Sequence, residues 1–149
     1  MSAKYFLDTN VLVYTFDETA PDKQERARQL VETALLTGDG VISYQVIQEF
    51  LNVATRKFKQ PLSLADASLY LEHVLNPLCE VPSSSELFGA GLVVANRFRL
   101  SFYDSLIVAA AQRSSCKVLY SEDLQHGQVL AGLEVVNPFR VGTKTEKVC

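Results

Sequence analysis

The chain has 149 residues, 48% of them hydrophobic and 21% charged, and its formal net charge at pH 7 is −3. This length predicts one domain with a core large enough to fold without disulfide or metal staples, and the composition excludes a disordered or fibrous protein. The negative charge is not typical of a protein that binds nucleic acid through an overall basic surface, although the distribution of charge counts for more than its sum.

The three cysteines predict neither a zinc site nor a disulfide framework. Cys79, Cys116 and Cys149 are widely spaced and odd in number. No apolar stretch reaches the length of a membrane span, and the first residues lack the apolar segment of a secretory signal. We therefore expect a cytoplasmic protein with no membrane partner.

The first expected element is a short buried strand over residues 5–7, which are apolar or aromatic without a polar interruption. Asp8 follows directly, and a carboxylate at the end of a buried strand is costly unless a polar or charged group meets it. Thr9 and Asn10 have short polar side chains that can do so. Ligands of open α/β sheets bind beyond the carboxyl ends of strands, so Asp8 lies where chemistry would be placed. Taken alone, this stretch favours a simple turn.

The next segment, residues 22–37, has the apolar spacing of a helix with one buried face, and Gly38 suits its end. The residues of that face are Ala27, Leu30, Val31, Ala34 and Leu35. A short strand at residues 41–42 follows. Ser43 then caps a helix to about residue 57, in which Glu49 lies on the flank of the apolar stripe rather than on the fully solvated face.

Two capping-box patterns predict two more helices. Ser63 begins a helix to about residue 75, which Pro77 is expected to end. The Ser-Ser-Ser-Glu run at residues 83–86 begins a helix to about residue 97. A strand over residues 78–81 is expected between them.

Residues 100–114 form the next predicted helix, and Asp104 lies in its first turn, where the helix dipole favours an anion. Apolar residues stand three, four and seven positions after Asp104, which puts its carboxylate on the apolar face. Stabilisation of the helix start alone would explain an Asp here, but its position on the core-facing side of the helix indicates an additional role. We expect the neighbouring Tyr103 to pack in the core rather than to stack on a nucleobase.

A strand is predicted over residues 117–121. Like the strand at residues 5–7, it is apolar and is followed by a polar segment with an acid, here Asp123. Residues 133–136 form the last expected strand. The polar residues 142–149 are expected to be a loose tail after a single domain of residues 1–141. Strands that alternate with helices predict a three-layer α/β sandwich with a mainly parallel central sheet.

Four acids stand out in this arrangement. Asp8, Asp104 and Asp123 follow strands or begin helices that share one edge of the sheet, and Glu49 can reach inward from its helix. Carboxylates in one crevice repel each other and lose hydration, and hard divalent cations such as Mg²⁺ or Mn²⁺ relieve both costs. The sequence therefore predicts a metal site with oxygen ligands, of the kind that activates water against a phosphodiester.

Four stretches carry these acids, and all four occur in the order and at the separations of one known family. They are FLDTNVLVY at residues 6–14, SYQVIQEF at 43–50, LSFYDSLI at 100–107 and LYSEDL at 119–124. The chain resembles the PIN-domain ribonucleases, in particular VapC-type toxins of toxin–antitoxin systems. Each block alone is weak, but the four together are specific. The resemblance implies a PIN-like sandwich and metal-dependent endonucleolytic cleavage of RNA.

The resemblance also implies roles for residues and partners. Asp8 and Asp104 would be the principal ligands of Mg²⁺ or Mn²⁺, with Glu49 and Asp123 completing the catalytic site directly or through water. The positions that orient these acids are matched by Thr9, Asn10 and Ser121. The family further implies a homodimer, and an antitoxin that inserts into the active-site groove and silences the enzyme.

Two alternatives compete with this interpretation. One is a catalytically inactive PIN-like module that binds RNA or protein, which loss of an acid would indicate; all four acids are present. The other is an α/β fold in which Asp8 accepts a phosphoryl group. A haloacid-dehalogenase-like enzyme needs a second Asp two residues later, where this chain has Asn10. A receiver-like domain needs a Lys near its last strand and an acidic pair near its first, and neither is evident.

Overall fold

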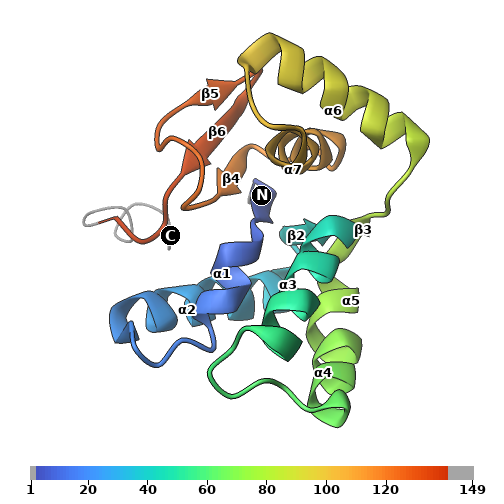
Figure 1. The fold of residues 1–149 in the computed structure, drawn as a ribbon. Helices are drawn as coiled ribbons and strands as arrows, with labels where there is room; N and C mark the ends of the chain where they lie inside the picture. The colour runs from blue at the N-terminus through green and yellow to red at the C-terminus, as the bar shows by residue number, and fades with distance from the viewer. Residues whose placement is uncertain (1–2, 141–149) are drawn as a thin grey trace.

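A six-stranded sheet runs through the computed structural model, which describes residues 3–140 (Figure 1). The strands are β1 (Tyr5–Leu7), β2 (Gly40–Ser43), β3 (Cys79–Val81), β4 (Val118–Tyr120), β5 (Val129–Leu130) and β6 (Leu133–Val136). Their order is β3-β2-β1-β4-β6-β5, and only the β5–β6 pair is antiparallel. The expected mainly parallel sheet is confirmed, with β1 between β2 and β4 at its centre.

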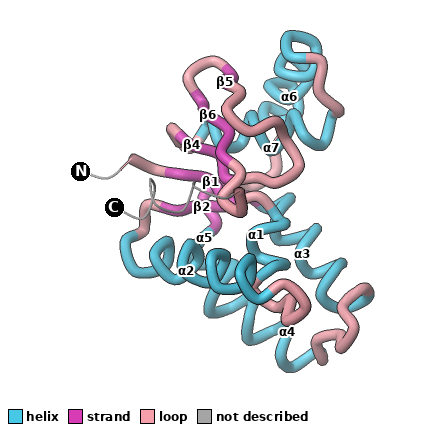
Figure 2. Tube along the Cα trace, turned by 90° about the vertical axis from the view of Figure 1, so that its left-hand side faces the viewer, coloured by secondary structure: helices cyan, strands magenta, loops and turns pink. Residues whose placement is uncertain are grey.

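Helices cover both faces of the sheet. They are α1 (Thr9–Tyr14), α2 (Pro21–Thr37), α3 (Tyr44–Arg56), α4 (Leu64–Tyr70), α5 (Asn76–Leu78), α6 (Ser85–Phe98) and α7 (Phe102–Arg113), with a π-helical segment, η1 (Leu71–Leu75), between α4 and α5. Helices α6 and α7 lie on one side, and α1 to α5 lie on the other (Figure 2). The predicted three-layer α/β sandwich is therefore confirmed. No helix within residues 3–140 combines the length and the apolarity needed to cross a membrane.

An aromatic cluster fixes α3 against the elements around it. Phe50 has no exposed surface and stacks on Tyr70 with ring centroids 4.9 Å apart. Phe16, which follows α1, contacts both rings, and so it ties the end of α1 to α3 and α4. Burying aromatic side chains of this size is a large favourable contribution to folding. Because Phe50 is anchored, its neighbour Glu49 is held at the edge of the core.

Helix α7 is enclosed between the sheet and α6. Its residues from Ser105 to Ala111 are all buried. Gly91 of α6 allows the two helices to approach closely, because a Cβ atom there would lie 2.8 Å from Leu106 Cδ2. A helix that is apolar on every side is held by packing all round, and this packing fixes the position of Asp104 in its first turn.

Several predicted helix boundaries and faces need correction. Ser84 rather than Ser83 caps α6, because its hydroxyl accepts the Leu87 N–H at 3.0 Å. Pro77 does not end the helical segment at residue 75: η1 runs directly into α5, which continues to Leu78, and the fixed φ of Pro77 is compatible with a helical backbone. Leu35 is 39% exposed, so the buried face of α2 ends at Ala34 and does not include Leu35.

Three further differences concern single elements. Tyr103 is 67% exposed at the start of α7, so the expectation that it packs in the core is wrong. Helix α1 and strand β5 were not expected, since six and two residues are too short for a hydrophobic period to show. The expected end of the domain at residue 141 and the expected tail at 142–149 lie outside the described residues.

Candidate functional site

Asp8 is the most buried acid of the site, with 5% of its surface exposed. It stands between β1 and α1 and caps the helix. Its Oδ1 accepts the Thr9 N–H at 2.7 Å, and its Oδ2 accepts the Ser121 hydroxyl at 2.7 Å. Burial raises the pKa of Asp8 to about 7, although these two hydrogen bonds pull it down. Burial therefore disfavours the charged form of Asp8, and the two hydrogen bonds offset only part of that cost.

Glu49 reaches the same place from α3. Its Oε1 accepts the Thr9 hydroxyl at 2.6 Å, and its Oε2 accepts the Gln45 side-chain amide at 3.1 Å. Thr9 therefore bonds two acids, Asp8 through its backbone and Glu49 through its side chain. The negative charge of Glu49 raises the pKa of Asp8 further, which is the effect of two carboxylates that share one site.

Asp123 joins the group from the loop after β4. Its Oδ2 accepts the Asn10 side-chain amide at 3.2 Å, and its N–H donates to Ser121 Oγ at 3.1 Å. Ser121 thus donates to Asp8 and accepts from Asp123, so one buried hydroxyl holds both. The charge of Asp123 also raises the pKa of Asp8. Tertiary structure brings together Asp8, Glu49 and Asp123 through Thr9, Asn10 and Ser121.

Asp104 lies half-buried in the first turn of α7, where Ser101 Oγ accepts its backbone N–H at 3.2 Å. The link to the other acids is Gln45, whose side-chain amide donates both to Glu49 and, at 3.2 Å, to the carbonyl oxygen of Tyr103. Within residues 3–140, hydrogen bonds connect Asp104 to the other three acids only by this indirect route. Asp104 is not among the residues that line the cavity described next.

A cavity of about 510 Å³ opens beside Thr9, Glu49 and Asp123. Its lining consists of Thr9, Asn10, Val13, Tyr14, Asp17, Glu49, Asn52, Val53, Glu122 and Asp123. Four of these ten described residues are acids and none is Lys or Arg. A phosphate group would be repelled there unless a cation neutralised the carboxylates.

The donor set fits a hard divalent cation by its chemistry. Within residues 3–140, no group of three or more His, Cys, Asp or Glu side chains is arranged to hold a metal ion. Mg²⁺, however, commonly uses only one or two carboxylates and completes its shell with water and phosphate oxygens. Asp8, whose pKa is raised mainly by burial and further by the charges of Asp123 and Glu49, is the kind of group that a bound cation would keep charged.

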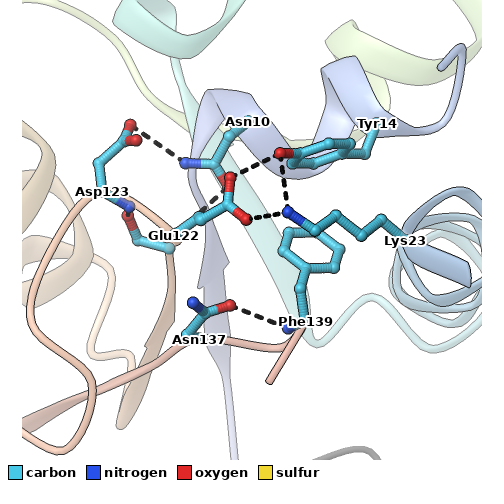
Figure 3. A network of polar contacts seen from close by, with 8 residues as sticks. Asn10, Tyr14, Lys23, Glu122, Asp123, Asn137 and Phe139 are labelled. Atoms are coloured by element: carbon cyan, nitrogen blue, oxygen red, sulfur yellow. Dashed lines mark hydrogen bonds and ion pairs between the residues drawn. The ribbon is translucent and has the colours of Figure 1, made fainter. Parts of the chain in front are cut away.

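One polar network beside the site was not expected from the sequence (Figure 3). Glu122 accepts hydrogen bonds from Tyr14 and Lys23, at 2.7 and 2.6 Å. The motif at residues 119–124 includes Glu122, but its partners lie about a hundred positions away, at |i−j| of 108 and 99. No local pattern points to pairs so distant, so only the fold reveals them.

The fold and the site define an α/β protein with acids gathered at the carboxyl end of its central strand. The family model of the PIN domain matches residues 5–129. The chain therefore belongs to the PIN domain family, which confirms the resemblance seen in the four motifs. No curated protein sequence matches it significantly.

Solved structures of toxin–antitoxin proteins share this fold. A toxin–antitoxin complex from Klebsiella pneumoniae superposes with a TM-score of 0.65 at 19% identity, covering 94% of this chain and 100% of that one. VapBC2 from Rickettsia felis, bound to a DNA fragment from its promoter, gives 0.61 at 15% identity, with 88% and 96% covered. VapC20 from Mycobacterium tuberculosis, described as a toxin that cleaves the sarcin–ricin loop, gives 0.53 at 17% identity, with 80% and 90% covered. At these identities the likeness is one of fold.

Proposed function

We propose that this protein is an endoribonuclease that depends on Mg²⁺ or Mn²⁺, and that it is the toxin of a type II toxin–antitoxin system. The observation that carries the proposal is the buried carboxylate of Asp8, held at both oxygens beside an acid-lined cavity and linked to Glu49 and Asp123. A structural role does not require a protein to bury one carboxylate close to two others, because each pays desolvation and repulsion.

The residues of the proposed site have two kinds of role: some would bind the cation, and others orient those ligands. When bound, a divalent cation would activate a water molecule and stabilise charge on the phosphodiester that is cut. Asp8 and Asp104 are the proposed principal ligands, and Glu49 and Asp123 complete the site directly or through water. The hydrogen bond from Ser121 favours the charged form of Asp8. Thr9 holds Asp8 and Glu49 at a fixed separation. Such support lowers the cost of orienting the acids when RNA binds.

An antitoxin is the proposed protein partner. The similar structures are of toxin–antitoxin proteins: one is a toxin–antitoxin complex, and another is VapBC2 bound to a DNA fragment from its promoter. We propose that an antitoxin segment enters the groove beside Glu49 and Asp123 and competes with RNA for it. An acid-lined groove favours a segment with cationic side chains.

A homodimer is the proposed assembly. Exposed apolar side chains gather on α6 and at the start of α7: Phe88, Leu92, Val93, Phe102 and Tyr103 are 43, 61, 67, 37 and 67% exposed. Phe88, Phe102 and Tyr103 line a second cavity of about 360 Å³. An exposed apolar patch of this kind supports an interface between protein surfaces. Sedimentation of the wild type and of Leu92→Glu would test it, with a monomeric wild type as the contradicting result.

One observation favours the alternative of an inactive PIN-like module that binds RNA or protein. Within residues 3–140 the acids are not gathered into a group of three that could hold a metal ion. A module that binds without cutting would need the groove and not the geometry of a cation site.

Cleavage of a mixed RNA pool separates the two functions. The purified protein would be incubated with Mn²⁺, with EDTA, and as the variant Asp104→Asn. Cutting that requires both the metal and Asp104 is the expected result, and the fragment ends would then identify the target. A wild-type protein that is folded, retains RNA in a filter-binding assay and cuts none of it would favour the inactive module.

A further inference from the structure

Glu122 lies in sequence between Ser121 and Asp123, yet its carboxylate is directed away from Asp123 and toward Tyr14 and Lys23 (Figure 3). Its Oε1 accepts the Tyr14 hydroxyl at 2.7 Å, and its Oε2 accepts Lys23 Nζ at 2.6 Å. Lys23 Nζ also donates to Tyr14 Oη at 3.2 Å, which closes the triangle. Both carboxylate oxygens are therefore engaged with α1 and α2. Glu122 thus differs in role from its neighbour Asp123, although the two acids are adjacent in sequence.

The main chain of Glu122 leads back to the site. Its N–H donates to Asn10 Oδ1 at 3.4 Å, and Asn10 Nδ2 donates to Asp123 Oδ2 at 3.2 Å. A side-chain amide has one accepting and one donating end. The N–H at Oδ1 therefore decides that the NH₂ group faces the Asp123 carboxylate. In the reverse orientation two oxygens would meet, so the placement of the Glu122 backbone bears directly on Asp123.

Lys23 is itself held in place. Its Nζ lies 4.8 Å from the centroid of the Tyr14 ring and 5.8 Å from that of Phe139, and the two rings meet edge to face at 4.7 Å. These cation–π contacts orient a side chain that would otherwise be free to move. The network thus ties the loop after β4 to α1, to α2 and to the segment after β6.

The ion pair in this network contributes little to the stability of the fold. The side chains of Lys23 and Glu122 are 38 and 27% exposed, and ion pairs as exposed as this one add little to folding free energy. What the network does restrain is geometry, because it fixes a short loop from one side while Ser121 fixes it from the other.

We propose that Glu122 is a positioning residue of the acidic site: held by Tyr14 and Lys23, it orients the Asn10 amide and through it the carboxylate of Asp123. This inference rests on the proposed function, since that is where Asp123 has a part in holding a cation. It assigns to Glu122 a role that needs no contact with a cation or a substrate.

The test compares Glu122→Gln, Lys23→Met and Tyr14→Phe with two controls. Lys23→Arg keeps the cation, and Glu80→Gln removes the acid of another exposed ion pair, Lys4–Glu80, whose side chains are 33 and 43% exposed. Two readouts do not depend on catalysis: the dissociation constant for Mn²⁺ by calorimetry, and the NMR resonances of the Asn10 side-chain amide and the Asp123 backbone amide in metal-free protein. RNA cleavage is the third readout.

We expect Glu122→Gln and Lys23→Met to weaken Mn²⁺ binding roughly tenfold, as loss of an outer-shell partner does. The Asn10 and Asp123 resonances should shift in both variants, and Tyr14→Phe should shift them in the same direction. The controls Lys23→Arg and Glu80→Gln should stay within about twofold of the wild type.

Two results would overturn the inference. One is wild-type Mn²⁺ affinity and unmoved resonances in Glu122→Gln, Lys23→Met and Tyr14→Phe alike. The other is an equal loss in Glu80→Gln, which would mean that net charge alone is responsible. A wild type that neither binds Mn²⁺ nor cuts RNA would instead refute the proposed function, and the resonances in metal-free protein would still decide the positioning role.

Discussion

Ser121 Oγ donates a hydrogen bond to Asp8 Oδ2 at 2.7 Å, joining two residues that are 113 positions apart in the sequence. It does so from a site with no exposed surface, and the same oxygen accepts the Asp123 N–H. One hydroxyl at the end of β4 therefore couples the acid after β1 to the acid in the next loop.

Replacing Ser121 with Ala should both destabilise and inactivate the protein. The change leaves an acceptor of Asp8 and the N–H of Asp123 without their partner, at a cost of about 1–3 kcal/mol in the free energy of unfolding. Cleavage should fall about tenfold or more, because both acids lose their orientation. Urea denaturation and RNA cleavage measure the two effects. Ser114→Ala is the matched control, because Ser114 is a buried serine at the C-terminal end of α7, opposite the end that carries Asp104, and it should lose stability and keep its activity.

Asp8→Asn should abolish cleavage while the fold remains intact. The substitution keeps the shape of the side chain and removes the charge that the proposed site needs, so the rate should fall by about 100-fold or more. Circular dichroism would check the fold, and Asp66→Asn, at an exposed position in α4, is the control that should cut normally. Full activity of Asp8→Asn would remove Asp8 from the mechanism.

The stability of the wild type should fall relative to Asp8→Asn as the pH rises from about 4 to above 7. The pKa of Asp8 rises from 3.8 to about 7 on folding. In this pH range the folded state therefore binds more protons than the unfolded state, and raising the pH costs stability. The contribution of Asp8 to the free energy of unfolding is fully present below pH 3.8 and is lost as the pH rises through the folded pKa of about 7.

Urea denaturation of both proteins at pH 5 and pH 8 would measure this effect. The stability of Asp8→Asn relative to the wild type should rise by on the order of 2–3 kcal/mol between the two pH values. A constant difference between the two proteins would show that Asp8 titrates alike in the folded and the unfolded state.

Mg²⁺ or Mn²⁺ should raise the melting temperature of the wild type by relieving the repulsion among Asp8, Glu49 and Asp123. A ligand that binds only the folded state stabilises it by mass action. Thermal scans with increasing metal at constant ionic strength measure the shift, and Asp8→Asn should show a smaller one. If the wild type melts at the same temperature in saturating metal, the carboxylates do not share a cation.

In the dissociated monomer, Tyr103→Ala should change the free energy of unfolding, measured by urea denaturation, by no more than about 0.5 kcal/mol, because Tyr103 is exposed there and its substitution removes little packing. Phe50→Ala is the comparison: it removes a ring with no exposed surface from the aromatic cluster, and the expected loss is about 3–5 kcal/mol. Similar losses in the two variants would mean that Tyr103 packs against another surface in solution.

The sequence alone determined the class of fold and the identity of the candidate acids. Hydrophobic runs and helical spacing are local, so the central strands and most helices could be predicted from neighbouring residues. The buried position of Asp8 followed in the same way, since it comes directly after an apolar strand.

Tertiary structure alone decided which side chains meet. The hydrogen bonds of Ser121 to Asp8, of Thr9 to Glu49 and of Asn10 to Asp123 join positions 113, 40 and 113 residues apart. The sequence also misplaced Tyr103 and did not single out the Glu122 network, because exposure and long-range pairing depend on how elements pack. Local spacing carries the period of a helix or strand, whereas the distance between two loops is set only when β1 and β4 pair in the sheet.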